Sequence, residues 1–263
     1  AARRTVSVLE CGRLAQRIVA EQTQGIVCAV FRRSCYLDFA GGRVLCVGER
    51  ALGRGPLNVL VDAFQPPRLD DVLGLRADAA AVWRPATRPS RPSQAALSAL
   101  CAAASACVPA EGLGRLICRG SSPLIEHVRP ALVALERWQA GGTLTAEVTT
   151  LLGLGPGLTP SGDDYLGGML IGLRLFGRAA DAEVLWAWLA PRVSAGTSRI
   201  SAAHLAAAAE GEAHETLHAC IDALAEGLSH GWPARLAALA SIGHCSGWDG
   251  LAGVIAAAER VAV

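Results

Sequence analysis

The spacing of apolar residues changes about one third of the way along the chain, from a period of two to a helical period. Short runs with alternating apolar and polar residues at 26–31, 34–39, 43–47, 57–62 and, more weakly, 79–83 predict strands. Gly41 and Gly42 predict a hairpin turn between the second and third of these strands. Because no long helical pattern separates the strands, we expect a mainly antiparallel, barrel-like sheet. A short amphipathic helix is expected before it, at 9–22.

Beyond a segment rich in Pro and Ser at 87–93, the helical period continues to the end of the chain. Helices are predicted at 94–107, 121–139, 143–152, 162–177, 181–193, 199–210, 213–227, 233–242 and 247–261. The fold class is therefore α+β, with a β-rich domain at 1–92 and an α-helical domain at 93–263.

Composition narrows the classes of function. The chain of 263 residues is 52% hydrophobic with a net charge of +1, which argues against a nucleic-acid partner. No apolar run reaches the length of about 18 residues that a membrane span needs. All 24 basic residues are Arg, which excludes Schiff-base chemistry on a lysine. The nine Cys lack a C-x-x-C pair and are expected to be buried free thiols in a reducing cytoplasm.

A loop rich in Gly and Pro at 153–160 leads into a predicted helix. Gly tolerates positive φ and Pro lacks an N–H, so these residues cannot form a regular helix or strand. Ser161, with Asp164 three residues later, has the spacing of a capping box and is the predicted N-cap. A loop of this kind presents N–H groups and the positive end of a helix dipole, which suits an anion. No Gly-Lys-Ser/Thr follows, so it is not a Walker A loop.

The same pattern occurs again near the end of the chain. Residues 161–170 align without gaps on residues 246–255, with Ser, Gly, Asp, Leu and Gly in common. Either an ancient duplication or two uses of one loop-to-helix solution explains this match. The plainer interpretation is two capped helices whose glycines allow close packing.

A third polar segment lies between these two motifs, at 195–204, and predicts another capped helix start. We expect the three helix N-termini, near residues 162, 199 and 247, to converge on one anion, within about 15 Å of one another. Backbone N–H groups would approach the anion at Gly155, Gly157, Gly162 and Gly247. Hydroxyl donors would be Thr159, Ser161, Thr197, Ser198 and Ser246, and Arg199 would offset the charge.

Four further residues are candidates for catalysis. His244 is the candidate general acid/base, although a packed or capping His explains it equally well. Asp164 and Asp249 are expected to orient the loops, whereas Asp163 has no counterpart at Trp248 and is freer to act on a substrate or hold Mg²⁺. No other cofactor is predicted.

His214 and His218 form an H-E-x-x-H sequence, the zinc-protease signature. Its context is poor, because no Glu follows at the spacing of a third ligand, although His244 or Asp249 could supply one. A zinc hydrolase is therefore the weaker alternative.

The segments 153–164, 197–201 with Leu205 and Gly211, and 242–249 together resemble the AllH family. This family includes a subunit of the bacterial oxamate carbamoyltransferase of anaerobic allantoin breakdown. The resemblance implies a cytoplasmic enzyme subunit that works with FdrA-like and AllG-like subunits. The implied reaction interconverts oxalurate plus phosphate with oxamate plus carbamoyl phosphate.

Carried over to this chain, the implied site lies in the loops 155–164 and 244–249 and in the segment 197–201, which includes Ser201. A scaffold or regulatory subunit, whose Gly-rich loops dock a partner, is the alternative of a different class.

Overall fold

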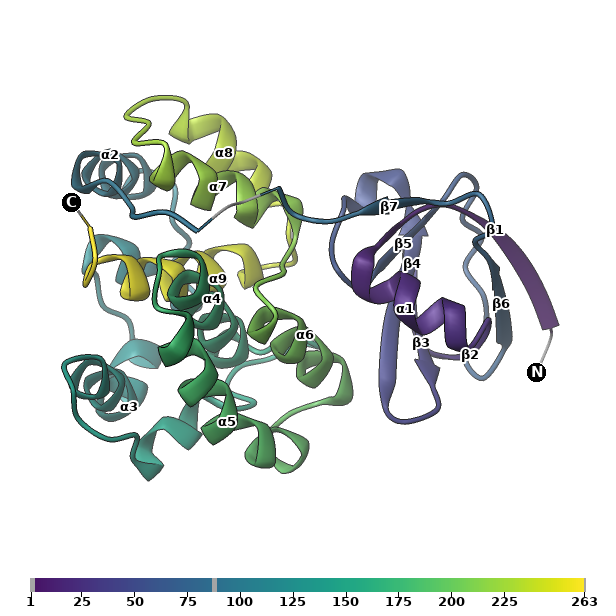
Figure 1. The fold of residues 1–263 in the computed structure, drawn as a ribbon, viewed down its shortest axis with the longest axis horizontal. Coiled ribbons are helices and arrows are strands. Elements are labelled where there is room, and N and C mark those ends of the chain that lie inside the picture. Colours follow the sequence, from purple (N-terminus) through teal and green to yellow (C-terminus); the bar gives the residue numbers. More distant parts are fainter. Residues whose placement is uncertain (1–2, 87–88, 263) are drawn as a thin grey trace. The chain divides into compact units, whose positions relative to one another are not determined.

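The computed structural model describes residues 3–86 and 89–262, which form two compact units (Figure 1). The front unit comprises the residues up to Ala86 together with Glu212–Glu215, and the helical unit comprises the remainder. The first two residues of the predicted linker, Thr87 and Arg88, lie outside the described residues.

The front unit is a closed barrel of six strands. Its elements are β1 (Arg3–Gly12), α1 (Arg13–Glu21), β2 (Gln24–Val30), β3 (Ser34–Phe39), β4 (Arg43–Glu49), the 3₁₀ helix η1 (Arg50–Leu52), β5 (Asn58–Val61), β6 (Val72–Arg76) and β7 (Ala81–Trp83). The order β5-β4-β3-β2-β6-β1 closes through pairing of β1 with β5, and β7 pairs with β1. Among the described strands, four pairings are antiparallel and three are parallel, so the sheet is mixed. The predicted barrel-like sheet is confirmed.

Strands β1 and β6 were not predicted. The helix expected at 9–22 begins only at Arg13, because residues 9–12 complete β1. In β6, Gly74 interrupts the apolar pattern, and a Gly weakens the strand signal. A Cβ at Gly74 would lie 2.9 Å from Thr5 Oγ1, so the missing side chain lets β6 pack against β1.

The helical unit contains α2 (Gln94–Ala104), η2 (Gly114–Cys118), α3 (Pro123–Gln139), η3 (Ala146–Leu151), α4 (Ser161–Leu175), α5 (Ala179–Gly196), α6 (Arg199–Ala209), α7 (Glu215–Ala225), α8 (Trp232–Leu239) and α9 (Ser246–Ala258). Each predicted helix is present, although the one expected at 143–152 is the 3₁₀ helix η3, and η2 was not predicted. The α+β fold class is confirmed. Helix α4 is buried along nearly its whole length, so it forms the centre of this unit beside α9 (Figure 1).

The cysteines only partly match the expectation of buried thiols. All nine are free, but Cys28 and Cys107 are exposed, and Cys101 and Cys118 are half-buried. Among the described residues, no helix has the length and apolar character that crossing a membrane requires.

Candidate functional site

The two repeated motifs pack against each other through their glycines. A Cβ at Gly168 of α4 would lie 1.8 Å from the carbonyl oxygen of Gly250 in α9. The matching contact is reciprocal: a Cβ at Gly253 would lie 1.9 Å from the carbonyl oxygen of Tyr165. Gly253 aligns with Gly168, and Gly250 aligns with Tyr165, so equivalent positions exchange contacts. The two helices therefore pair about a pseudo-twofold axis, at a distance that only glycine allows.

The two motifs also resemble each other in the turn that precedes each helix. A Cβ at Gly162 would lie 2.0 Å from the Leu151 carbonyl oxygen, and a Cβ at Gly247 would lie 2.3 Å from that of Leu239. The N–H of Gly162 donates to Leu154 and that of Gly247 to Ile242, three residues after each Leu. The repeat is thus a structural one that includes the preceding turn, which favours duplication over chance similarity.

The hydroxyl group of each motif bonds to the carboxylate of the other. Ser246 donates to Asp164, and Ser161 donates to Asp249. Thr159 Oγ1 also lies 2.9 Å from Ser246 Oγ, which joins the Gly-rich loop to the start of α9. The capping-box spacing predicted Ser161 as the N-cap of α4, and this prediction is wrong because the Ser161 hydroxyl bonds to Asp249 instead. Pro160 occupies the cap position, Ser161 is the first helical residue, and its hydroxyl is directed to the other motif.

Asp164 and Asp249 lie close enough for the charge on one to affect the other. Burial raises the pKa of Asp164 well above its usual range, the bonds from Ser246 and Thr159 oppose this, and the neighbouring Asp249 and Asp163 add to it. Burial raises the pKa of Asp249 to about 6 against the bonds from Ser161 and from the backbone of Leu113 and Gly114. Within the described part of the chain, Oδ2 of each is buried without a hydrogen-bond partner. Both groups therefore favour the protonated state more than an ordinary Asp does.

Asp163 is occupied by internal hydrogen bonds. Its Oδ1 accepts from the Gly153 N–H at 2.9 Å, and its Oδ2 accepts from Ser201 Oγ at 2.6 Å and from Thr197 Oγ1. The side chain is 2% exposed. Asp163 thus ties the Gly-rich loop to the start of α6, and no oxygen of its carboxylate is left without a donor. Its predicted role toward a substrate or Mg²⁺ has no support in this geometry.

The third predicted segment, 195–204, contacts the Gly-rich loop and the start of α4. The predicted capped helix start is confirmed: Ser198 is the N-cap of α6 and accepts a bond from the Ser201 N–H at 3.1 Å. Its hydroxyl also donates to the Leu158 carbonyl oxygen at 3.1 Å. Through Ser198, Asp163 and Thr159, hydrogen bonds connect all three predicted segments, so the expected convergence within about 15 Å is confirmed. Arg199 is exposed in the first turn of α6.

The loop glycines hold the backbone that the sequence predicted. Gly155 and Gly157 have φ values of +112° and +95°, which L side chains rarely adopt. Among the described residues, the N–H groups of Gly155, Gly157 and Leu158 take part in no backbone hydrogen bond. They are therefore candidate donors to a ligand, whereas the N–H groups of Gly162 and Gly247, which were also predicted to approach the anion, are bonded to the Leu154 and Ile242 carbonyl oxygens.

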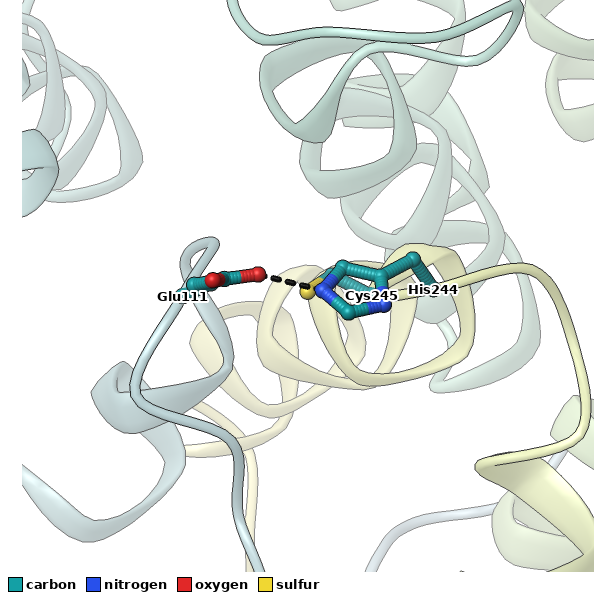
Figure 2. A group of neighbouring side chains, drawn as sticks. All are labelled: Glu111, His244 and Cys245. Atoms are coloured by element: carbon teal, nitrogen blue, oxygen red, sulfur yellow. Dashed lines mark hydrogen bonds and ion pairs between the residues drawn. The ribbon is translucent and has the colours of Figure 1, made fainter.

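His244 lies directly before α9 and contacts a residue that sequence analysis missed. Its Nε2 pairs with Glu111 Oε2, and the Cys245 sulfur lies beside the imidazole ring (Figure 2). Burial raises the pKa of the Cys245 thiol, and the charges of Asp249, Glu111 and Asp164 raise it further. Glu111 is 133 residues from His244 in the sequence and stands in no motif, so no sequence signal marks it.

The H-E-x-x-H sequence is divided between the two units. His214 belongs to the front unit, where its Nε2 lies 3.0 Å from the Leu52 carbonyl oxygen, whereas His218 is buried in α7 of the helical unit. In the described part of the chain, the only group with metal-ligand spacing is Glu111, His244 and Cys245.

A pocket of about 340 Å³ lies elsewhere, between α3, α4 and α9. Tyr165, Glu136 and Arg260 are among its lining residues, and none of the predicted site residues is. Tyr165 is buried there, and burial raises the pKa of its phenol.

These features define a class: an α+β protein whose helical unit is built on two paired loop-to-helix motifs. Comparison with family models shows a more specific likeness for part of the chain. Residues 151–258 match the model of the oxamate carbamoyltransferase subunit AllH. The resemblance to the AllH family, expected from the motifs, is confirmed over these residues, which include both motifs and the start of α6. No curated protein and no solved structure matches the chain.

Proposed function

We propose that the chain is a subunit of a carbamoyltransferase-type enzyme and that the junction of the three segments binds its small anionic substrate. The observation that carries the proposal is the coincidence of the family match with this junction: the matched residues 151–258 contain all three converging segments. The candidate substrates are carbamoyl phosphate, phosphate, oxamate and oxalurate.

The chemistry of the reaction explains why such a junction is useful. In the transfer of a carbamoyl group from oxalurate to phosphate, a phosphate oxygen attacks the carbamoyl carbon and the bond to the oxamate nitrogen breaks. Negative charge develops on the carbamoyl oxygen, and the leaving nitrogen takes up a proton. Oriented N–H donors, a cation and a proton carrier supply what this reaction needs.

The candidate donors of the site lie on the Gly-rich loop. The N–H groups of Gly155, Gly157 and Leu158 would receive the anion, and Arg199 on the neighbouring α6 would offset its charge. The hydroxyls of Ser161, Ser246, Thr197 and Ser201 bond to aspartates, so their role is to hold the loops in place. His244, whose ring Glu111 orients, is the proposed proton carrier.

Calorimetric titration with phosphate, carbamoyl phosphate and oxamate tests the binding step. Wild type should bind at least one of them saturably, and Arg199→Gln should weaken that binding about tenfold, since an exposed charged hydrogen bond contributes about 1.5 kcal/mol. Arg137→Gln, which removes an exposed Arg of α3, is the matched control and should bind as wild type does.

Activity is tested on the chain alone and after addition of FdrA-like and AllG-like subunits. Formation of carbamoyl phosphate from oxalurate and phosphate that depends on Arg199 would support the proposal. If the assembled enzyme is active and Arg199→Gln and His244→Asn leave both KM and kcat unchanged, the junction is not the substrate site. The chain is then a scaffold subunit.

A further inference from the structure

One cluster beside the junction combines the proposed proton carrier, His244, and its partner Glu111 with a thiol that the anion site does not use. Glu111, His244 and Cys245 bring a carboxylate oxygen, an imidazole nitrogen and a thiol sulfur within 4.8 Å of one another (Figure 2). Glu111 comes from the loop before η2, and the other two residues come from the turn before α9. We propose that these three side chains bind a thiophilic divalent metal ion, for which Zn²⁺ is the best fit.

The donor set selects the metal. Thiolate, imidazole and carboxylate are the protein ligands of Zn²⁺, at about 2.0–2.3 Å from the ion, whereas Mg²⁺ prefers oxygen ligands alone. The three donor atoms must move together by roughly 1 Å to reach this geometry. The side chains of Glu111 and His244 are 71% and 81% exposed, so most of their surface lies in solvent, where they can change rotamer. Cys245 is buried and provides the fixed ligand.

The backbone around the cluster is held in place by Asp249. Asp249 Oδ1 accepts the Leu113 N–H at 2.6 Å, and a Cβ at Gly112 would lie 2.5 Å from the same oxygen. Gly112 has a φ of +73°, so both its backbone and its missing side chain allow this approach. The Asp249 N–H in turn donates to the Cys245 carbonyl oxygen at 2.9 Å. One buried carboxylate therefore positions the loop of Glu111 against the turn of Cys245, which makes Asp249 a positioning residue of the metal site.

Binding of the metal ion displaces hydrogen from its ligands. The metal ion binds the Nε2 lone pair of His244 in place of the hydrogen shared with Glu111 Oε2; a neutral imidazole keeps its one hydrogen on Nδ1, and an imidazolium releases its second hydrogen to solvent. The Cys245 thiol also releases its proton to solvent. Three protein ligands leave one tetrahedral position open, as in catalytic zinc sites. His244 is then a ligand, and its role as proton carrier applies to the metal-free site only. The metal site does not depend on the proposed carbamoyl transfer, and its test has a readout of its own.

Cobalt substitution gives that readout. The full chain is stripped with a chelator and titrated with Co²⁺, and the absorption spectrum is recorded. Wild type should bind one Co²⁺ with the charge-transfer band of a cobalt–thiolate bond and the visible bands of a tetrahedral site, and Zn²⁺ should displace it. Cys245→Ser should abolish the charge-transfer band.

Glu111→Gln keeps the test valid if Cys245→Ser does not fold, because Glu111 is exposed. It should weaken Co²⁺ binding at least about tenfold, since even the loss of an outer-shell partner of a metal ligand costs 10- to 100-fold. The matched controls are Cys107→Ser and Glu226→Gln, both exposed residues of the same unit, which should bind as wild type does. Absence of saturable binding by wild type, or a charge-transfer band that persists without Cys245, would overturn the proposal and leave a surface ion pair beside a buried thiol.

Discussion

The two copies of the repeated motif agree in their packing and differ in their chemistry. In both, a Ser-Gly pair begins the helix, an Asp bonds to the other copy's Ser, and a Gly one turn later lies against the partner backbone. The first copy has the long Gly-Pro-Gly loop and Asp163. The second has a shorter turn with His244 and Cys245, and Trp248 in place of Asp163.

This comparison separates structure from candidate function within one motif. Positions shared by both copies form the pseudo-twofold helix pair, so they would be retained in any protein built on that pair. Positions that differ are not needed for the pairing. They include the candidate N–H donors of the first copy and the proposed metal ligands of the second, which is where function is expected to lie.

The largest expected effect comes from breaking the helix pair at a shared glycine. Gly168→Ala places a Cβ 1.8 Å from the Gly250 carbonyl oxygen, a backbone atom that cannot turn aside. We expect a loss of more than about 3 kcal/mol in the free energy of unfolding, at or beyond the upper end for overpacked cores. Denaturant unfolding followed by circular dichroism measures it.

Gly167→Ala is the matched control, one residue earlier in the same helix. Its Cβ would make an ordinary 3.5 Å contact with Ala208, and the aligned position of α9 already holds Ala252. A helical Gly→Ala change here should stabilise the protein by up to about 1 kcal/mol. Equal effects of the two changes would contradict the close pairing of α4 and α9.

A smaller effect is expected from the position where the copies differ. Asp163→Asn keeps the size of the side chain but removes a charged acceptor of the Thr197 and Ser201 hydroxyls. The free energy of unfolding should fall by about 1.5–3 kcal/mol, the range for hydrogen bonds to a charged group. A variant as stable as wild type would show that Asp163 does not hold the loop, and would return it to the candidates for substrate binding.

The smallest expected effect is a pH dependence at a shared position. The pKa of Asp249 is raised from about 3.9 when unfolded to about 6 when folded, so the folded state binds more protons between these values. The stabilisation of the folded state by protonated Asp249 is complete below about pH 4 and is lost as the pH rises through 6. Between pH 5 and pH 7.5 this group alone should lower the free energy of unfolding by about 1.4 kcal/mol.

Unfolding of wild type and Asp249→Asn at both pH values isolates this contribution. The amide can still accept the Leu113 N–H and does not titrate, so the variant should lose less stability than wild type on going to pH 7.5. Identical pH dependence in the two proteins would mean that Asp249 is ionised throughout and lies in a more polar site than its burial indicates.

Much of this protein follows from its sequence alone. The change from a period of two to a helical period determines the α+β class, because side chains alternate along a strand and recur every three to four residues along a helix. The repeat, the loop glycines with positive φ and the cap at Ser198 are local features too, so they could be predicted without any contact information.

The way in which these local pieces meet depends on tertiary contacts that the sequence does not reveal. Ser161 fits a capping box by spacing, yet its hydroxyl bonds to Asp249, 88 residues away. Asp163 was predicted to be available to a substrate because its three donors, in Gly153, Thr197 and Ser201, stand at no sequence spacing that marks a contact. Glu111 was missed because no local sequence pattern marks the partner of an exposed Glu. The spacing of apolar residues along the chain determines its helices and strands. The partner of a polar side chain depends instead on which backbone segments can approach each other, and here the glycines at the crossing of α4 and α9 allow that approach.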